Sequence, residues 1–165
     1  MCELHRIEDS ISVQVAQYHR LMEPTATIAI SLGAILSRGF RSDLYVELTA
    51  DIAEGLTQAT YPVLSAIERA GEPVSAAGLA PTVGLDRSVI SRRAATLIRA
   101  GLVTNATGAA DRRQALLTLT PAGDDAIQMT RERLDVAIHR HIADWPESDQ
   151  KTFATLLERF TASRL

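Results

Sequence analysis

The chain has 165 residues, and 46% of them are hydrophobic. This length and hydrophobic content are enough for a sizeable core in one domain with helical extensions. The longest apolar run, residues 27–36, is shorter than the roughly 20 residues of a membrane-spanning helix, so we expect a soluble cytoplasmic protein without a membrane partner. The only cysteine, Cys2, cannot form an internal disulfide, which agrees with a reducing compartment. The net charge of −3 by itself argues against unspecific affinity for nucleic acid, so the distribution of charge matters more than the total.

Positive charge is nevertheless concentrated in one segment. Residues 86–113 contain six arginines and two aspartates, a net charge of +4, which leaves −7 for the rest of the chain. A basic patch on an acidic body suits a protein that binds phosphates at one surface only.

Two helical segments are expected in the N-terminal third. Apolar side chains at intervals of three or four residues predict a helix over about 10–22, ended by Pro24, and a second helical pattern over 25–54. Gly39 is expected to kink or divide the second segment.

The next helix is expected to run from an N-cap at Thr57 to about residue 70, where Gly71 ends it. Pro62 lies five residues after the proposed cap, near the limit where a missing backbone amide is harmless. This helix is therefore expected to begin later than Thr57 or to bend.

A short strand over 72–74 and an N-cap at Ser75 are expected to follow. Pro81 should limit the helix after Ser75 to a turn or two before Gly84, because proline lacks the amide that continues the hydrogen-bond ladder.

A helix is predicted over 87–99, with Asp86 as N-cap and Gly101 at the end. One of its faces is apolar, and the other is small, hydroxyl-bearing and basic. The polar stripe consists of Ser88, Ser91, Arg92, Ala95 and Arg99. Arginine binds guanine edges bidentately and serine bonds to bases or phosphates, so the stripe favours the major groove of duplex DNA over a merely solvated face.

A basic hairpin is predicted after this helix. Residues 102–104 and 114–119 have strand composition, residues 105–111 have turn composition, and Arg112 and Arg113 follow the turn. A narrow minor groove attracts inserted arginines. A basic helix followed by a basic hairpin indicates a winged helix.

Two further helices are expected after the hairpin. Thr120 and Pro121 form a strong helix start, and the helix runs to about residue 143. The paired Asp124 and Asp125 suit the helix dipole better than metal binding or acid/base catalysis, because no convergent ligand or nucleophile accompanies them. A last helix after Pro146 carries an apolar face made of Phe153, Leu156, Leu157 and Phe160. This face is expected to pack on the N-terminal helices or on a second copy of the chain.

The segment from about Leu56 to Gly123 resembles the multiple-antibiotic-resistance-regulator (MarR) family, with four motifs in the same order and spacing. The motifs are Leu85-Asp86-Arg87-Ser88, Gly101-Leu102-Val103, Asp111-Arg112-Arg113 and Leu119-Thr120-Pro121-Ala122-Gly123.

The resemblance implies a function and an assembly. It implies a homodimeric regulator, most simply a repressor, that binds double-stranded DNA at a palindromic operator and answers to a small-molecule effector. The helix at 87–99 would lie in the major groove, Arg113 would enter the minor groove, and Asp111 would orient the wing arginines. The residues assigned to DNA are Arg87, Ser88, Ser91, Arg92, Arg99, Arg112 and Arg113.

The predicted fold class is mainly α with a small β-hairpin wing. A winged helix-turn-helix domain at 56–121 is flanked by N-terminal helices at 1–55, which form the body and contribute to dimerisation, and by C-terminal dimerisation helices at 122–165.

Other chemistries are weakly indicated. No nucleophile motif, phosphate-binding glycine loop or cofactor site is present, so we expect no enzyme and no cofactor. His139 and His141 are two residues apart on a helix and cannot share a metal ion. The aromatic side chains are either core or the lining of an effector pocket, and they are Tyr18, Tyr45, Tyr61 and Trp145. Two alternatives stay open: a redox regulator that senses through Cys2, and a winged-helix protein-interaction module without DNA binding.

Overall fold

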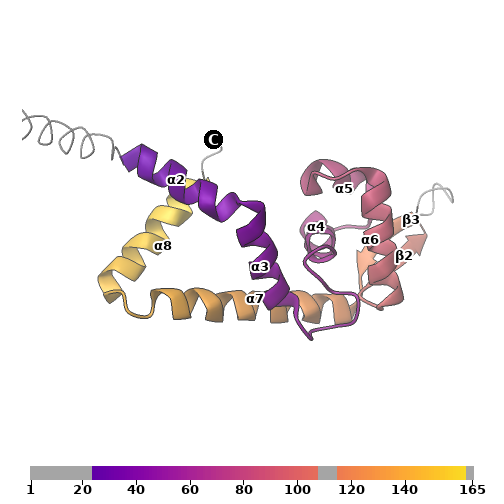
Figure 1. The fold of residues 1–165 in the computed structure, drawn as a ribbon. Helices are drawn as coiled ribbons and strands as arrows, with labels where there is room; N and C mark the ends of the chain where they lie inside the picture. Colours follow the sequence, from indigo (N-terminus) through magenta and orange to yellow (C-terminus); the bar gives the residue numbers. More distant parts are fainter. Residues whose placement is uncertain (1–23, 108–114, 163–165) are drawn as a thin grey trace, which may run out of the picture. The chain divides into compact units, whose positions relative to one another are not determined.

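The computed structural model describes residues 24–107 and 115–162, and Figure 1 shows their helices and strands. The chain divides into two compact units, one up to Tyr45 and one from Val46 onward. The helix expected over 10–22 lies outside the described residues. The three-part division at residues 55 and 121 stays a prediction.

The first unit holds helix α2, Pro24–Leu36, and the larger part of helix α3, Arg38–Thr49. The expected division falls at Ser37 and not at Gly39, because the Ser37 Oγ accepts a hydrogen bond of 3.3 Å from the Phe40 backbone N–H and so caps the new helix. The prediction that helix continues to residue 54 was wrong, since α3 ends at Thr49.

Helix α4, Tyr61–Ala70, has its N-cap at Thr60, three residues after the predicted cap at Thr57. Pro62 thereby occupies the first turn, where its missing amide costs nothing. The Thr57 side chain instead accepts hydrogen bonds from the backbone of Ala59 and Thr60 within a preceding turn. Gly71 ends the helix in the left-handed conformation, as predicted.

The short strand β1, Val74–Ser75, is followed by the two-turn helix α5, Ala76–Val83. A short strand followed by a short helix was predicted for this segment. The Ser75 Oγ accepts a hydrogen bond from the Gly78 N–H, and Gly84 ends the helix with φ 68°. Pro81 lies inside α5, and the helix closes only two residues after it.

Helix α6, Arg87–Arg99, has the predicted bounds and lies beside a small antiparallel sheet in Figure 1. The sheet is three-stranded in the order β1-β3-β2, where β2 is Val103–Thr107 and β3 is Ala115–Leu119. The pairing of Val103 with Leu119 sets the hairpin register. Strand β2 continues to Thr107, so the turn predicted from residue 105 starts too early.

The core of this winged domain lies between helices α4, α5 and α6 and the sheet. The side chains of this core are aliphatic, which suits close packing. Those with no more than 2% of their surface exposed include Val63, Leu64, Leu79, Ile90, Leu97, Leu102, Val103 and Ile127.

Helix α7, Pro121–Ile142, starts at a junction that joins α6, β2 and α7. The Thr120 Oγ1 donates to the Gly101 carbonyl at 2.7 Å and accepts from the Gly123 N–H at 3.1 Å. The Thr120 N–H donates to the Leu102 carbonyl at 3.1 Å. Three hydrogen bonds around one threonine therefore determine how the long helix leaves the winged domain.

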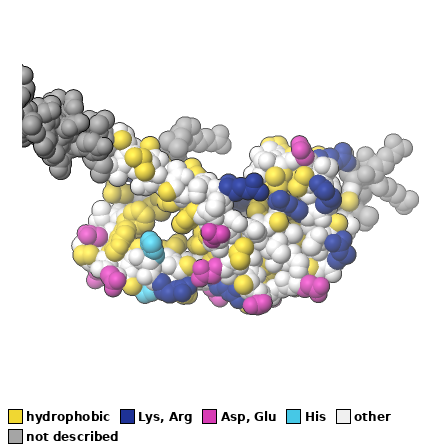
Figure 2. Space-filling view, viewed as in Figure 1, with side chains coloured by type: hydrophobic (Ala, Val, Ile, Leu, Met, Phe, Trp, Pro, Cys, Tyr) yellow, Lys and Arg dark blue, Asp and Glu magenta, His cyan; other side chains and the backbone are white. Residues whose placement is uncertain are grey.

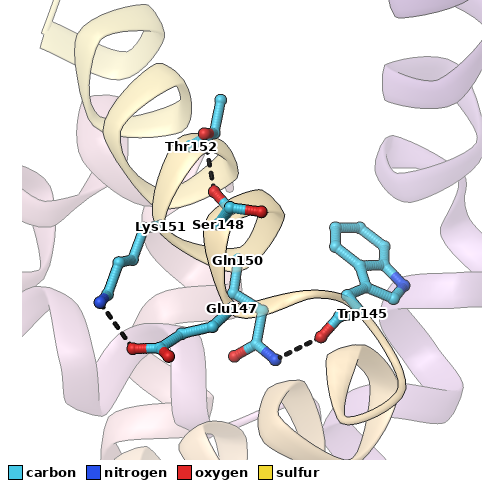
Figure 3. A network of polar contacts seen from close by, with 6 residues as sticks. All are labelled: Trp145, Glu147, Ser148, Gln150, Lys151 and Thr152. Atoms are coloured by element: carbon cyan, nitrogen blue, oxygen red, sulfur yellow. Dashed lines mark hydrogen bonds and ion pairs between the residues drawn. The ribbon is translucent and has the colours of Figure 1, made fainter.

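Helix α8, Glu147–Ala162, follows a turn that side chains close (Figure 3). The Gln150 amide donates to the carbonyl oxygens of Ile142 and Trp145 at 3.2 and 3.0 Å. The Trp145 and Phe153 rings meet edge to face with centroids 5.6 Å apart. Across the residues that the structure describes, none of the helices combines the length and apolarity that would let it cross a membrane.

Candidate nucleic-acid interface

Helix α6 is anchored by its apolar face. Ile90 and Leu97 have 0% of their surface exposed and Ala94 has 2%. They pack in the core against α4, α5 and strand β2. Because this face is fully buried, the rotation of α6 about its axis is determined, and the opposite face must point to solvent.

The exposed face of α6 carries all five of its predicted DNA-binding side chains. The structure leaves each of them exposed, and they are Arg87, Ser88, Ser91, Arg92 and Arg99. Arg93, which contributes to the charge of the segment, is half-buried beside the core face. The described residues offer no hydrogen bond to the Asp86 side chain, so Asp86 occupies the N-cap position without the predicted side-chain cap.

Asp111, Arg112 and Arg113 lie outside the described residues, as does Cys2. The last described pair of the hairpin is Thr107 with Ala115, and both strands lead toward the predicted tip from that pair.

Thr96 is a residue on α6 that the sequence analysis did not single out. Its Oγ1 donates to the Arg92 carbonyl at 3.3 Å and accepts a hydrogen bond of 3.1 Å from the Arg99 Nη2. The spacing of the two residues could have indicated this contact, since side chains three residues apart on a helix are neighbours. Composition alone did not distinguish Thr96 from an ordinary helical threonine.

The charge of this surface is positive. The described residues from 86 to 107 and 115 to 119 include four arginines and one aspartate, a net +3. Figure 2 shows Lys and Arg side chains, in dark blue, gathered over the winged domain. Figure 1 places α6 in that part of the molecule. A surface with hydroxyls, arginines and only one acidic group suits the phosphates and base edges of a duplex.

Other residues were considered as metal ligands, catalytic acids or effector-pocket lining. His139 and His141 are both exposed, and within the described ranges no three His, Cys, Asp or Glu side chains are grouped as a metal ion would need. Asp124 lies in the first turn of α7, where Thr120 provides the cap. Tyr61 packs against the core. Tyr18 lies outside the described residues.

A three-helix core, a helix that exposes arginines and serines, and an antiparallel hairpin together define a winged helix-turn-helix protein. Comparison with known proteins supports this class. A model of the MarR family matches residues 54–114. The uncharacterized HTH-type transcriptional regulator YxaD of Bacillus subtilis is 24% identical over 124 residues, 75% of this chain and 86% of YxaD.

Solved structures have the same fold. A transcriptional regulator (MarR family) from Rhodococcus sp. RHA1 is 26% identical with a TM-score of 0.59, over 80% of this chain and 93% of the regulator. The PcaV transcriptional regulator from Streptomyces coelicolor, in complex with its natural ligand, is 23% identical with a TM-score of 0.52, over 86% of this chain and 94% of PcaV. The chain is therefore similar to MarR-family regulators over residues 54–114 and has the winged helix-turn-helix fold of transcriptional regulators.

Proposed function

We propose that this protein is a sequence-specific DNA-binding regulator, most simply a repressor, that acts in the cytoplasm as a homodimer on a palindromic operator. The observation that carries the proposal is the division of α6 into a wholly buried apolar face and an exposed face of arginines and serines. The side chains assigned to base edges and phosphates on this helix are Arg87, Ser88, Ser91, Arg92 and Arg99. The wing, with Arg112 and Arg113 oriented by Asp111, is assigned to the adjacent minor groove.

The direct test is operator binding by the purified chain. A mobility shift and footprint on its own upstream intergenic DNA, at two salt concentrations, should give a salt-sensitive palindromic footprint. The footprint should be lost in an Arg92→Ala/Arg113→Ala double variant. If neither that DNA nor a random duplex pool is bound specifically, the alternative of a protein-interaction module is favoured.

The dimer is supported by the apolar face of α8. Phe153, Leu156, Leu157 and Phe160 are 37–55% exposed, and no described residue of α8 is buried. An uncovered face with four large apolar side chains marks an interaction surface. A symmetric second copy would cover it and would place two recognition helices about 34 Å apart, one turn of DNA.

Leu157→Glu is expected to shift the chain from dimer to monomer, because it places a charge within the face that the partner would bury. Analytical ultracentrifugation at micromolar concentration measures the shift. Thr155→Glu is the matched control, since Thr155 is exposed on the opposite side of α8 and should leave the mass unchanged. A Leu157→Glu protein with the parent's mass would contradict the assignment of α8 to the dimer.

We also propose a small-molecule effector and no enzymatic activity. The support is the match of residues 54–114 to the MarR family and the structure of the similar PcaV regulator with its natural ligand. An effector lowers the affinity for operator DNA if it binds the DNA-free form more tightly than the DNA-bound form. The ratio of the two effector affinities equals the factor by which the operator affinity falls.

A further inference from the structure

The contacts of Thr96 distinguish Arg99 from the other exposed arginines of α6. The Arg99 Nη2 donates to the Thr96 Oγ1 at 3.1 Å, whereas the structure records no side-chain partner for Arg87 or Arg92 among the described residues. A guanidinium has five N–H donors, so one bond to Thr96 leaves most of them available to an anion.

Thr96 is itself held in one orientation. Its hydroxyl donates to the Arg92 carbonyl at 3.3 Å. On the other side, a Cβ built on Gly55 would lie 3.3 Å from the Thr96 Cγ2, so the turn at Gly55 packs close to that methyl group. The Gly55 carbonyl accepts a hydrogen bond of 2.7 Å from the Thr60 Oγ1, which secures the turn. The Thr96 methyl therefore faces the domain and its hydroxyl faces Arg99.

The position of Arg99 along α6 indicates what it contacts. Ser88 and Arg99 are about 16 Å apart along the helix axis at a rise of about 1.5 Å per residue. The major groove is about 12 Å wide, and recognition helices contact base edges with their N-terminal residues. With Ser88 and Arg92 at the bases, Arg99 lies at the edge of the groove, where the phosphates of the duplex are.

We propose that Thr96 is a positioning residue that holds the Arg99 guanidinium ready for a backbone phosphate of the operator. The inference rests on the proposed function. Holding the side chain before binding lowers the conformational entropy that Arg99 loses when it contacts the phosphate. The pair therefore adds affinity for any duplex and leaves the choice of sequence to the N-terminal part of α6.

The experiment uses the full chain and a duplex selected from a random pool, beside an unrelated duplex of equal length. Arg99→Ala should weaken binding to both duplexes by a similar factor, about 10-fold, and lower the salt slope by about 1. Thr96→Val keeps the shape of the side chain and should weaken binding about 3-fold, while Thr96→Ser keeps the hydroxyl and should restore most of it.

A double-mutant cycle identifies positioning. Thr96→Val should have no further effect on DNA affinity in the Arg99→Ala protein, because Thr96 would act only through that guanidinium. Thr155→Val is the matched control. The Thr155 hydroxyl, like that of Thr96, donates to the carbonyl four residues earlier, at 3.0 Å, but Thr155 lies on α8, outside the proposed DNA-binding surface. The DNA affinity of this control should equal the parent's.

Two results would overturn the proposal while leaving DNA binding intact. One is an Arg99→Ala protein whose preference changes at one base pair, which would make Arg99 a base reader. The other is a Thr96→Val effect of the same size with or without Arg99. A parent chain that selects no duplex would instead overturn the proposed function together with this role.

Discussion

Gly123→Ala is expected to lower the free energy of unfolding by about 3 kcal/mol. Gly123 is buried in the first turn of α7, and a Cβ on it would overlap the Leu102 carbonyl oxygen. That oxygen is a backbone atom and already accepts the Thr120 N–H at 3.1 Å, so it cannot move away cheaply. The clash therefore outweighs the roughly 0.5–1 kcal/mol that alanine gains over glycine in a helix.

Urea denaturation at a single protein concentration measures this effect, since dimerisation makes stability depend on concentration. Gly39→Ala is the matched control. Gly39 lies within α3, and no atom of the described residues lies inside 4 Å of a built Cβ, so alanine there should leave stability unchanged or raise it slightly. If both variants unfold at the same urea concentration as the parent, α7 does not need the close approach at Leu102.

Arg92→Ala is expected to weaken binding to the selected duplex by roughly 5- to 150-fold, which corresponds to about 1–3 kcal/mol for one lost base contact. Arg92 is exposed near the middle of α6, on the same stripe as Ser88. Its loss should also relax the preference at one position of the site, because a base contact discriminates between sequences and a phosphate contact does not.

Titration against the selected duplex and a set of duplexes with single base-pair changes measures both effects. Arg159→Ala serves as the control, because it removes the same charge from an exposed position on α8. Equal losses for Arg92→Ala and Arg159→Ala would mean that only net charge matters. Loss of affinity without any change in preference would assign Arg92 to a phosphate.

Helix α6 was predicted with its bounds because several local signals agreed. A cap position at Asp86, an apolar stripe at helical spacing and a glycine after the last turn all indicated one helix. The later start of α4 was expected from Pro62, but its cap was predicted wrongly at Thr57, because two threonines could each cap a helix there. Thr60 takes the cap position, and its Oγ1 bonds to the Gly55 carbonyl at 2.7 Å. Local spacing does not show which of two similar hydroxyls has a partner across a turn.

The break between α2 and α3 illustrates the same limit. Gly39 was the stronger signal in the sequence, yet glycine in a helix only costs stability, whereas a serine cap forms a hydrogen bond. Ser37 therefore ends one helix and starts the next, and Gly39 remains helical.

The sequence by itself determined the class of the protein. The period of the apolar residues, the caps and the concentration of arginines between residues 86 and 113 indicate a winged helix. These signals depend on residues close together in the chain, so they can be interpreted without knowing which distant segments are in contact.

Only the tertiary structure showed which face of α6 is exposed and how its side chains are held. Burial of Ile90 and Leu97 orients the arginine face outward, the Gly55 turn orients Thr96 toward Arg99, and the Leu102 carbonyl requires a glycine at 123. Each of these depends on contact between segments far apart in the chain, which residue spacing does not encode.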